Sequence, residues 1–363
     1  MRLLFAESSI RGYGTEQHIA ALATAMARRG HDVRCLVIAG SPVQILLRAA
    51  RVPTVSVRPG RTRGMRIAFA LLRLAARQRP DWMISNDPRF YRMLLAVRRI
   101  TGARVALFRH WHDAPSRPRT RELLARRADR FILVSRFHRE DYRRQGMWVE
   151  RTSVLYNPID TERFRPSPAL RASTRARLGC ADSEVIVGYV GRMIGAKGIF
   201  TLLEATERLF GRETSASMLW VGDGEDSATL RARVARSMHA NRHRFLGWEA
   251  DMAALYPALD ILAVPSLYPE PFGRVCVEAQ AAAVPVVSSR AGGLPETFVP
   301  ESTGFGVEPG DADGLAAAIL DLIGDPERRR RMGAAGREWA CARFSLERIG
   351  GDFERLLGGD QSR

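Results

Sequence analysis

Lysine is nearly absent from this chain of 363 residues: its 56 basic residues are 55 arginines and the single Lys197. Cysteine is also scarce, and Cys35, Cys180, Cys276 and Cys341 lie far apart in the sequence. This spacing predicts neither a disulfide framework nor a metal-binding cluster. It is typical of a protein kept in a reducing cytoplasm.

Long apolar runs are missing as well. No segment approaches the roughly 20 consecutive apolar residues that a membrane-spanning helix needs. The opening apolar run reaches an acidic residue already at Glu7, which predicts a first strand rather than a secretory signal. The hydrophobic content of 46% is typical of a globular protein, and the length allows two domains with separate cores.

Acidic residues are depleted only in the first half. Residues 1–165 carry 33 arginines and 13 acidic residues, a net charge of +20, whereas residues 166–363 have a net charge of −3. An arginine-rich genome explains why arginine replaces lysine, but it accounts less well for this asymmetry. We therefore expect the first half to attract polyanions: an anionic membrane surface, an acidic lipid or saccharide, or a nucleic acid.

Strand and helix patterns alternate along both halves, which predicts parallel sheets with helical crossovers. The expected strands are 3–7, 33–39, 82–85, 104–108, 130–134, 154–156, 185–190, 217–221, 244–246, 261–264, 284–288 and a short one near 306–307. The expected helices include 17–29, 64–79, 91–99, 121–127, 135–144 and 200–209.

A polar stretch with two prolines, 160–168, is the best candidate for a linker. We predict an N-terminal domain at 1–165 and a C-terminal domain at 166–344, with a last helix at about 345–363 packing back on the first domain. Ligands of such sheets bind at the carboxyl ends of the strands. A cleft between two facing domains is therefore the expected site.

Lys197 lies in a glycine-rich turn, 191–198, that follows the apolar run 185–190. An ammonium is a compact point charge on a flexible stem, whereas a guanidinium is a planar fork. A chain that uses arginine almost everywhere but lysine here indicates a need for the point charge. Glycines let the backbone approach a ligand, and a following helix start attracts anions. The turn predicts a phosphate or diphosphate clamp; the alternative is an incidental surface lysine.

Two glutamates lie in the segment 265–279. Glu270 is in a proline-rich turn, and Glu278 lies inside the helix that Gly273 opens. A carboxylate accepts well from the vicinal hydroxyls of a ribose or a hexose, and the free N–H groups of a helix start can bind an anion. The pair therefore indicates a sugar or nucleotide ligand; the alternative for Glu278 is an exposed helical glutamate.

In their order and spacing these motifs resemble the retaining glycosyltransferases of family GT4. Glu270 and Glu278 match the family's E-x7-E element. Further matches are Gly191-Arg192, Lys197-Gly198, Gly222-Asp223-Gly224, Phe245-Leu246-Gly247, Leu259-Asp260, Pro265-Ser266, Gly292-Gly293-Leu294-Pro295-Glu296, Ser135 and Asn157-Pro158-Ile159-Asp160. The resemblance implies an α/β protein of the GT-B fold, with two facing Rossmann-like doubly wound parallel-sheet domains and the active site in the interdomain cleft.

The resemblance also assigns roles. Arg192 and Lys197 would hold the diphosphate of a nucleotide-sugar donor, Glu278 its ribose, and Glu270 the transferred sugar. The remaining expected donor contacts are Gly14, Leu246, Phe272, Gly273 and Arg274. Among these residues Lys197, Arg192 and Glu270 are expected to serve catalysis directly.

A histidine completes the expected catalytic set. His110, which follows the strand 104–108, matches the family's active-site histidine near the sugar and the acceptor. His112 and Asp113 are close alternatives, as is a histidine with a purely structural role. Gly14 and Glu16 match the end of the family's N-terminal G-G-x-E loop.

That loop departs from the pattern. Its first glycine is Tyr13 here, so a side chain stands where the family brings its backbone close to the diphosphate. The sequence thereby leaves the path of the loop open.

The expected reaction is a metal-independent sugar transfer with retention, without a cofactor. In this fold the basic first domain would receive the acceptor, a lipid-linked or phosphorylated saccharide such as a lipopolysaccharide core, at the cytoplasmic face of the membrane. The stretch 61–79 is basic with an apolar face and is either a membrane-surface helix or a core helix with a basic solvent side. Arg117, Arg119, Arg121, Arg126 and Arg127 are candidates for an acceptor mouth.

Two other classes remain as alternatives. A nucleotide-sugar epimerase shares the fold but needs no acceptor. A nucleic-acid-binding protein is suggested by the isoelectric point near 11, but the sequence shows no helix-turn-helix, zinc or aromatic RNA-binding pattern. We therefore expect no nucleic-acid partner.

Overall fold

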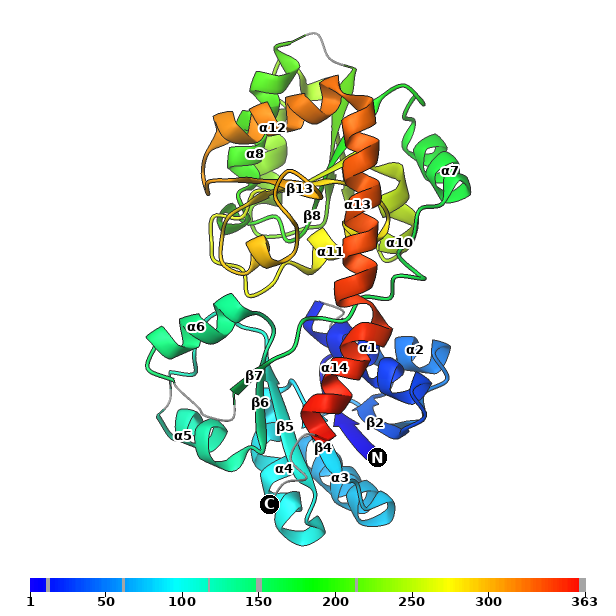
Figure 1. Cartoon of the computed structure of the whole chain (residues 1–363), viewed down its shortest axis with the longest axis vertical. Helices are drawn as coiled ribbons and strands as arrows, with labels where there is room; N and C mark the ends of the chain where they lie inside the picture. The colour runs from blue at the N-terminus through cyan, green and yellow to red at the C-terminus, as the bar shows by residue number, and fades with distance from the viewer. Residues whose placement is uncertain (11–13, 61–62, 117, 148–151, 213–214, 359–363) are drawn as a thin grey trace. The chain divides into compact units, whose positions relative to one another are not determined.

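The computed structural model describes residues 1–10, 14–60, 63–116, 118–147, 152–212 and 215–358 (Figure 1). The chain divides into two compact units. Unit 1 comprises Met1–Pro158 and Ser345–Arg363, and unit 2 comprises Ile159–Phe344. Each unit is built on its own parallel sheet.

Unit 1 contains a sheet of seven strands in the order β3-β2-β1-β4-β5-β6-β7, with every neighbouring pair parallel. The strands are β1 (Arg2–Ala6), β2 (Asp32–Ile38), β3 (Thr54–Val57), β4 (Trp82–Ser85), β5 (Arg104–Arg109), β6 (Arg130–Leu133) and β7 (Thr152–Val154). The helices are α1 (Gly14–Arg28), α2 (Pro42–Ala49), α3 (Arg63–Gln78), α4 (Pro88–Thr101), α5 (Pro118–Arg127), α6 (Arg136–Arg144) and α14 (Leu346–Gly358).

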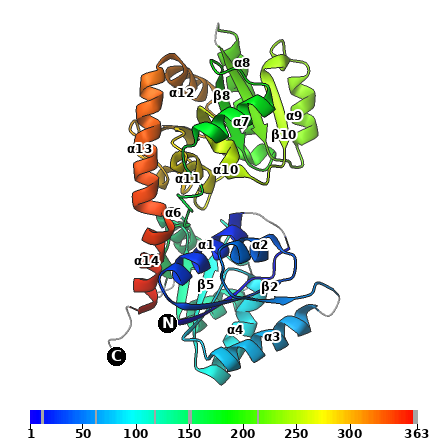
Figure 2. The same cartoon turned by 90° about the vertical axis from the view of Figure 1, so that its right-hand side faces the viewer.

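Helices cover both faces of this sheet. Side chains of α3, α4 and α5 pack against one face, and side chains of α1, α2 and α14 pack against the other. Figure 2 shows the sheet between α1 and α2 on one side and α3 and α4 on the other. Because β4 and β5 lie inside the sheet, their residues are buried in a continuous run, as expected for a parallel strand covered on both faces.

Unit 2 contains a sheet of six strands in the order β10-β9-β8-β11-β12-β13, again all parallel. The strands are β8 (Val185–Val190), β9 (Ala216–Val221), β10 (His243–Gly247), β11 (Ile261–Val264), β12 (Val286–Ser289) and β13 (Gly304–Val307). The helices are α7 (Pro168–Leu178), α8 (Ile199–Phe210), α9 (Ser227–Val234), α10 (Met252–Leu255), α11 (Arg274–Ala281), α12 (Ala312–Gly324) and α13 (Pro326–Phe344).

The chain passes from unit 1 to unit 2 after Pro158 and returns to unit 1 at Ser345. Residues 159–165, which the sequence analysis assigned to the first domain, pack with unit 2. The Ile159 N–H donates to the carbonyl oxygen of Phe344 at 2.8 Å, and the ring of Phe164 lies edge-on to that of Tyr256 at 5.9 Å. At the other end, α14 returns to unit 1 and lies beside α1, with Phe353 fully buried in that core (Figure 1).

In unit 1 the structure adds two elements that the sequence patterns did not indicate, α2 and β3. The helix α2 begins at a capped start, where the Ser41 hydroxyl accepts from the N–H of Gln44 at 3.3 Å. The strand β3 is an edge strand of four residues with only Val57 buried. Such a short, half-exposed strand carries no hydrophobic periodicity to detect.

Candidate functional site

Unit 2 has a sheet edge where ligand-binding loops are expected. β8 and β11 are neighbours, but the chain continues from β8 to β9 on one side and from β11 to β12 on the other. Ligands of open parallel sheets bind at such a switch point, beyond the carboxyl ends of the strands. The motif-rich loops 191–198 and 265–273 leave from these two strand ends.

Lys197 and Glu270 meet at this point. Nζ of Lys197 donates to Oε1 of Glu270, with side chains that are 22% and 12% exposed. The Ser266 hydroxyl donates to the same carboxylate oxygen at 2.9 Å, and the lysine nitrogen lies 5.4 Å from the centre of the Tyr268 ring. Lys197 is therefore a half-buried, paired cation and not an incidental surface lysine.

Backbone contacts fix the turn that carries this lysine. Gly198 has φ of 73°, and a Cβ there would lie 1.8 Å from the carbonyl oxygen of Pro265, so no side chain fits. The Leu267 N–H donates to the Ala196 carbonyl oxygen at 3.0 Å. The two loops are thus joined by their backbones as well as by the ion pair.

Glu278 is buried in α11, with 5% of its surface exposed. Its Oε1 accepts from Nε of Arg274 at 2.7 Å, and its Oε2 accepts from the hydroxyl of Tyr256 at 3.1 Å. Burial and the adjacent carboxylate raise the pKa of Tyr256, so its hydroxyl stays protonated and donates. The alternative of an exposed helical glutamate is wrong.

The motif 292–296 packs against the Glu270 loop. The carbonyl oxygen of Glu270 accepts from the Gly293 N–H at 2.7 Å, and a Cβ on Gly292 would lie 2.4 Å from that oxygen. Gly273, at the start of α11, has φ of 115° and leaves no room for a Cβ beside Leu294. This motif therefore supports the Glu270 loop.

Two further candidates lie at neighbouring strand ends. The Arg192 side chain is exposed and forms no ion pair within the described part of the chain, while its carbonyl oxygen accepts from the Tyr189 hydroxyl at 2.7 Å. Leu246 is half-buried near the end of β10. Beside it, the Gly247 carbonyl oxygen accepts from the Gly222 N–H at 2.7 Å, which holds the loop after β9 in place.

Two residues of the family motifs, Phe272 and Asp260, have side chains that contact other parts of unit 2. Phe272 is 3% exposed and packs edge-on against Phe344 with ring centres 5.6 Å apart. Asp260 accepts from Nη1 of Arg175 at 3.1 Å and from the N–H of Ile186 at 2.8 Å. A donor contact of Phe272 would therefore involve its backbone, and Asp260 anchors α7 to the sheet.

In unit 1 the two candidate histidines have different surroundings. His110 follows β5 directly and is half-buried, with its ring centre 4.6 Å from that of His18. His112 turns to α6, where Nδ1 lies 3.1 Å from a carboxylate oxygen of Asp141 and the ring stacks on Phe137. His112 therefore belongs to the packing of α6, and His110 stands at a strand end.

The loop before α1 is only partly described. Gly14 begins α1, whereas Tyr13 and the Glu16 side chain lie outside the described residues. Ser135, the expected strand-end serine, caps α6 by accepting from the His138 N–H at 2.9 Å.

The arginines expected around an acceptor have mixed positions. Arg121 donates to the Pro115 carbonyl oxygen at 2.6 Å and to the Gln145 carbonyl oxygen at 3.1 Å, so it ties the start of α5 to neighbouring turns. Arg119 and Arg127 are exposed. Arg117 and the Arg126 side chain lie outside the described residues.

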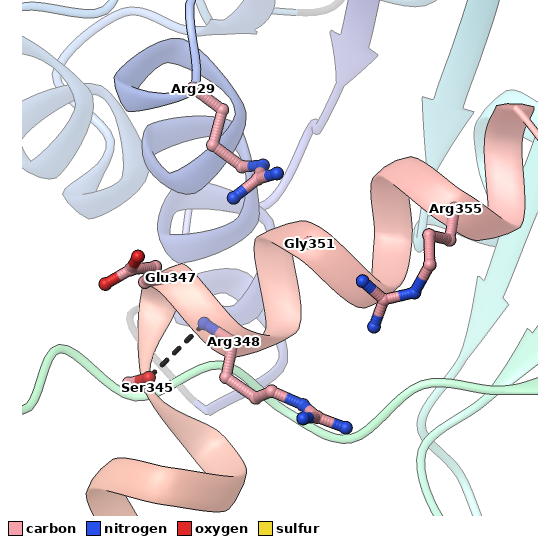
Figure 3. A pocket seen from close by; sticks show the side chains of 6 residues that line it. All are labelled: Arg29, Ser345, Glu347, Arg348, Gly351 and Arg355. Carbon is pink, nitrogen blue, oxygen red and sulfur yellow. Dashed lines mark hydrogen bonds between the residues drawn. The ribbon is translucent and has the colours of Figure 1, made fainter.

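A surface pocket lies elsewhere, between α1 and α14 of unit 1 (Figure 3). It is lined by Arg29, Ser345, Glu347, Arg348, Gly351 and Arg355. Its three arginines already pair with carboxylates of Glu354 and Asp352. The pocket contains none of the motif residues. Over the described parts of the chain, no three His, Cys, Asp or Glu side chains are grouped so that they could hold a metal ion.

Comparison with known proteins identifies the family. Residues 171–339 match the family described as glycosyl transferases group 1, and residues 13–163 match glycosyltransferase family 4. A GDP-mannose-dependent alpha-(1-6)-phosphatidylinositol monomannoside mannosyltransferase of Mycobacterium tuberculosis is 32% identical over 286 residues, 74% of either chain. The chain belongs to the family 4 glycosyltransferases.

Two further proteins are similar to this glycosyltransferase. A GDP-mannose-dependent monoacylated alpha-(1-6)-phosphatidylinositol monomannoside mannosyltransferase of Corynebacterium glutamicum is 36% identical over 212 residues, and the match spans 56% of this chain and 55% of the relative. The crystal structure of Anabaena HepE with UDP-glucose superposes with a TM-score of 0.85 and 25% identity, covering 99% of this chain and 100% of that one.

These matches confirm the predicted family and the GT-B fold of two Rossmann-like domains. The enzyme is a glycosyltransferase, as predicted. None of the helices formed by the described residues is both long and apolar enough to cross a bilayer.

Proposed function

We propose that this enzyme transfers a sugar, with retention and without a metal ion, from a nucleoside diphosphate sugar to a lipid-linked or otherwise anionic saccharide. The observation that carries the proposal is the Lys197–Glu270 pair at the switch point of unit 2. A cation there neutralises a leaving diphosphate, and a carboxylate there accepts from sugar hydroxyls. The complexes of HepE with UDP-glucose and the GDP-mannose dependence of the two mannosyltransferases support a donor of this class.

The two cations play different parts. Lys197 is prepaired, so its ammonium is already oriented when the donor arrives, and the diphosphate shares it with Glu270. Arg192 is exposed and brings a planar guanidinium that binds phosphate oxygens bidentately. Together they supply the positive charge that a metal ion supplies elsewhere.

Glu278 binds the ribose of the donor. Its two oxygens accept from Arg274 and Tyr256, and a carboxylate has about four acceptor positions. The remaining positions are open to the vicinal hydroxyls. Backbone groups of Phe272, Gly273 and Arg274, together with Leu246 and Gly14, complete the donor contacts, and His110 serves the transferred sugar and the acceptor.

The acceptor side of the proposal rests on α3. Its core face carries Ile67, Leu71 and Leu74. Its solvent face carries a second apolar stripe, Met65, Phe69 and Leu72, which are 70%, 67% and 39% exposed. Arg66, Arg73 and Arg77 are exposed beside this stripe. The buried face fits the interpretation of α3 as a core helix, and the exposed apolar stripe is the feature on which we base the membrane proposal.

An apolar stripe flanked by arginines suits the interface of an anionic bilayer, where apolar side chains insert and guanidinium groups meet lipid phosphates. We place the enzyme on the cytoplasmic face of such a membrane, where it would reach a lipid-linked acceptor. The phosphatidylinositol mannoside named for both mannosyltransferases is an acceptor of this type.

Vesicle flotation tests the membrane arm. Wild type should float with vesicles that contain phosphatidylglycerol and remain in the bottom fraction when the vesicles are pure phosphatidylcholine. Replacing Met65, Phe69 and Leu72 by serine should abolish flotation, whereas Ile45→Ser, at a 63% exposed position on α2, should leave it intact. Equal recovery of wild type and triple variant on anionic vesicles would refute docking through α3.

A thermal-shift panel of UDP, GDP, ADP, CMP and TDP tests the donor arm. A nucleotide at 100 times its Kd adds about 2.7 kcal/mol of stability, which raises Tm by several degrees. We expect one nucleotide to stabilise wild type and not Lys197→Ala. Glu270→Gln should bind the same nucleotide at least as tightly, because its lysine is no longer shared with a carboxylate. No stabilisation by any of the five would refute the donor assignment.

The alternative on the same fold is a nucleotide-sugar epimerase. The two reactions differ in their need for an acceptor: a transferase moves the donor sugar to the acceptor, whereas an epimerase inverts a stereocentre of the sugar in the nucleotide sugar and needs no acceptor. Product analysis with and without a glycolipid extract separates them, and product formed at the same rate without acceptor would favour the epimerase.

A further inference from the structure

His18 is a fully buried histidine in α1 that no motif of the sequence analysis singled out. Its ring centre lies 4.6 Å from that of His110, at an interplanar angle of 65°, and 4.8 Å from that of Phe108. Phe108 and His110 project from the same side of β5, with parallel rings 6.3 Å apart. Phe353 of α14 packs on Phe108 at 5.7 Å. His18 thus sits in a cluster of rings that ends at His110.

The backbone around His110 is fixed independently of His18. On the strand side, the Tyr91 hydroxyl donates to the carbonyl oxygen of Phe108. On the loop side, the carbonyl oxygen of Trp111 accepts from the Tyr142 hydroxyl at 3.0 Å and from Nε2 of His138 at 2.8 Å. Hydrogen bonds to the Phe108 and Trp111 carbonyl groups thus hold the backbone on both sides of His110.

The ring of His18 limits rotation of the His110 side chain. Edge-to-face ring pairs have a preferred geometry, and a ring with no exposed surface cannot move aside to accommodate a new rotamer of its neighbour. Phenylalanine at this position would keep a flat ring against His110, whereas alanine would remove it.

We propose that His18 is a positioning residue that holds the His110 ring in its working orientation. This proposal rests on the catalytic role proposed above for His110. His18 does not touch the reacting groups; it acts through the ring that does. Losing it should cost about 10- to 100-fold in kcat, the range expected when a catalytic group is displaced by about 1 Å, with KM for the donor nearly unchanged.

A double-mutant cycle tests this role. UDP-glucose and GDP-mannose are the probes, and release of UDP or GDP reports turnover in wild type, His18→Ala, His110→Ala and the double variant. We expect His18→Ala to lower kcat only when His110 is present, and His18→Phe, which keeps a flat ring, to recover most of the loss. Equal losses in both backgrounds would mean that His18 is merely structural and would overturn the proposal.

Nitrogen-15 spectra of labelled histidines provide a readout that needs no substrate. His18→Ala should shift the ring signals of His110, assigned with His110→Gln, whereas Ile349→Ala, a truncation in the core cluster that contains Phe108, should leave them in place. Unchanged His110 signals in His18→Ala would overturn the proposal whatever the donor is. Shifted signals together with full turnover of His110→Ala would instead overturn the catalytic role of His110, and this proposal with it.

Discussion

Replacing Lys197 by arginine is the sharpest test of the donor clamp, because the chain uses arginine at every other basic position. The lysine ends a short turn whose backbone is held by Ala196 and by the close contact at Gly198. Its Nζ donates to Glu270 and lies 5.4 Å from the centre of the Tyr268 ring. A guanidinium is wider and planar, so it cannot place its charge at the point where the ammonium sits.

The expected magnitudes follow from this geometry. Lys197→Ala removes one preorganised cation and should cost about 2–4 kcal/mol of transition-state stabilisation, roughly 30- to 900-fold in kcat/KM. Its cost to folding should be smaller, about 1–2 kcal/mol, because both partners keep some solvent contact and Ser266 still donates to Glu270. Lys197→Arg should fold like wild type and still lose at least about tenfold in turnover.

Both quantities can be measured on the same preparations. Initial rates of nucleotide release over a range of donor concentrations give kcat/KM, and urea unfolding gives the stability of each variant. Arg192→Lys serves as the matched control, since it makes the opposite exchange at the exposed cation of the same loop. Turnover of Lys197→Arg equal to wild type would show that any positive charge suffices and would refute the argument from the lone lysine.

Three further predictions concern the glycine turn, the ribose contact and pH. Gly198→Ala should lower the unfolding free energy by more than about 3 kcal/mol, visible as a lower Tm, because its Cβ would lie 1.8 Å from a carbonyl oxygen. Glu278→Gln should weaken binding of the nucleotide selected by the panel about 10- to 100-fold by calorimetry, since a charged acceptor is lost; unchanged affinity would exclude the ribose contact. Burial lowers the pKa of His138 and of His243 to about 4, so the unfolded chain binds protons that the folded one does not, and each should cost about 2 kcal/mol of stability between pH 7 and pH 5. In urea titrations, the unfolding free energy of His138→Leu should fall less between pH 7 and pH 5 than that of wild type. An equal fall would contradict a lowered pKa of His138 as its cause.

The sequence by itself determined the class of fold and pointed to the two loops that carry Lys197 and Glu270. Buried strands of a parallel sheet are continuous apolar runs, so β8, β11 and β4 were predicted at their observed bounds. Glycines that admit no Cβ, such as Gly198 and Gly292, lie in turns where two backbones meet, and such glycines are visible in the sequence without a structure. Both signals depend on residues that are close together in the chain, so they can be read from the sequence alone.

The tertiary structure decided which residues act together. Lys197 and Glu270 are 73 residues apart in the chain, and only the sheet order, which places β8 beside β11, brings them together. Tyr256 donates to Glu278, but it lies in no motif from which this contact could have been predicted.

The same holds for the histidines and for α3. Only the structure shows that His112 contacts Asp141 of α6 and that the ring of His18 contacts that of His110. The periodicity of α3 could not tell a buried apolar face from an exposed one because the helix has both. The physical reason is common to all these cases: hydrophobic pattern encodes whether a side chain is buried, whereas its partner is set by the packing of segments that are distant in sequence.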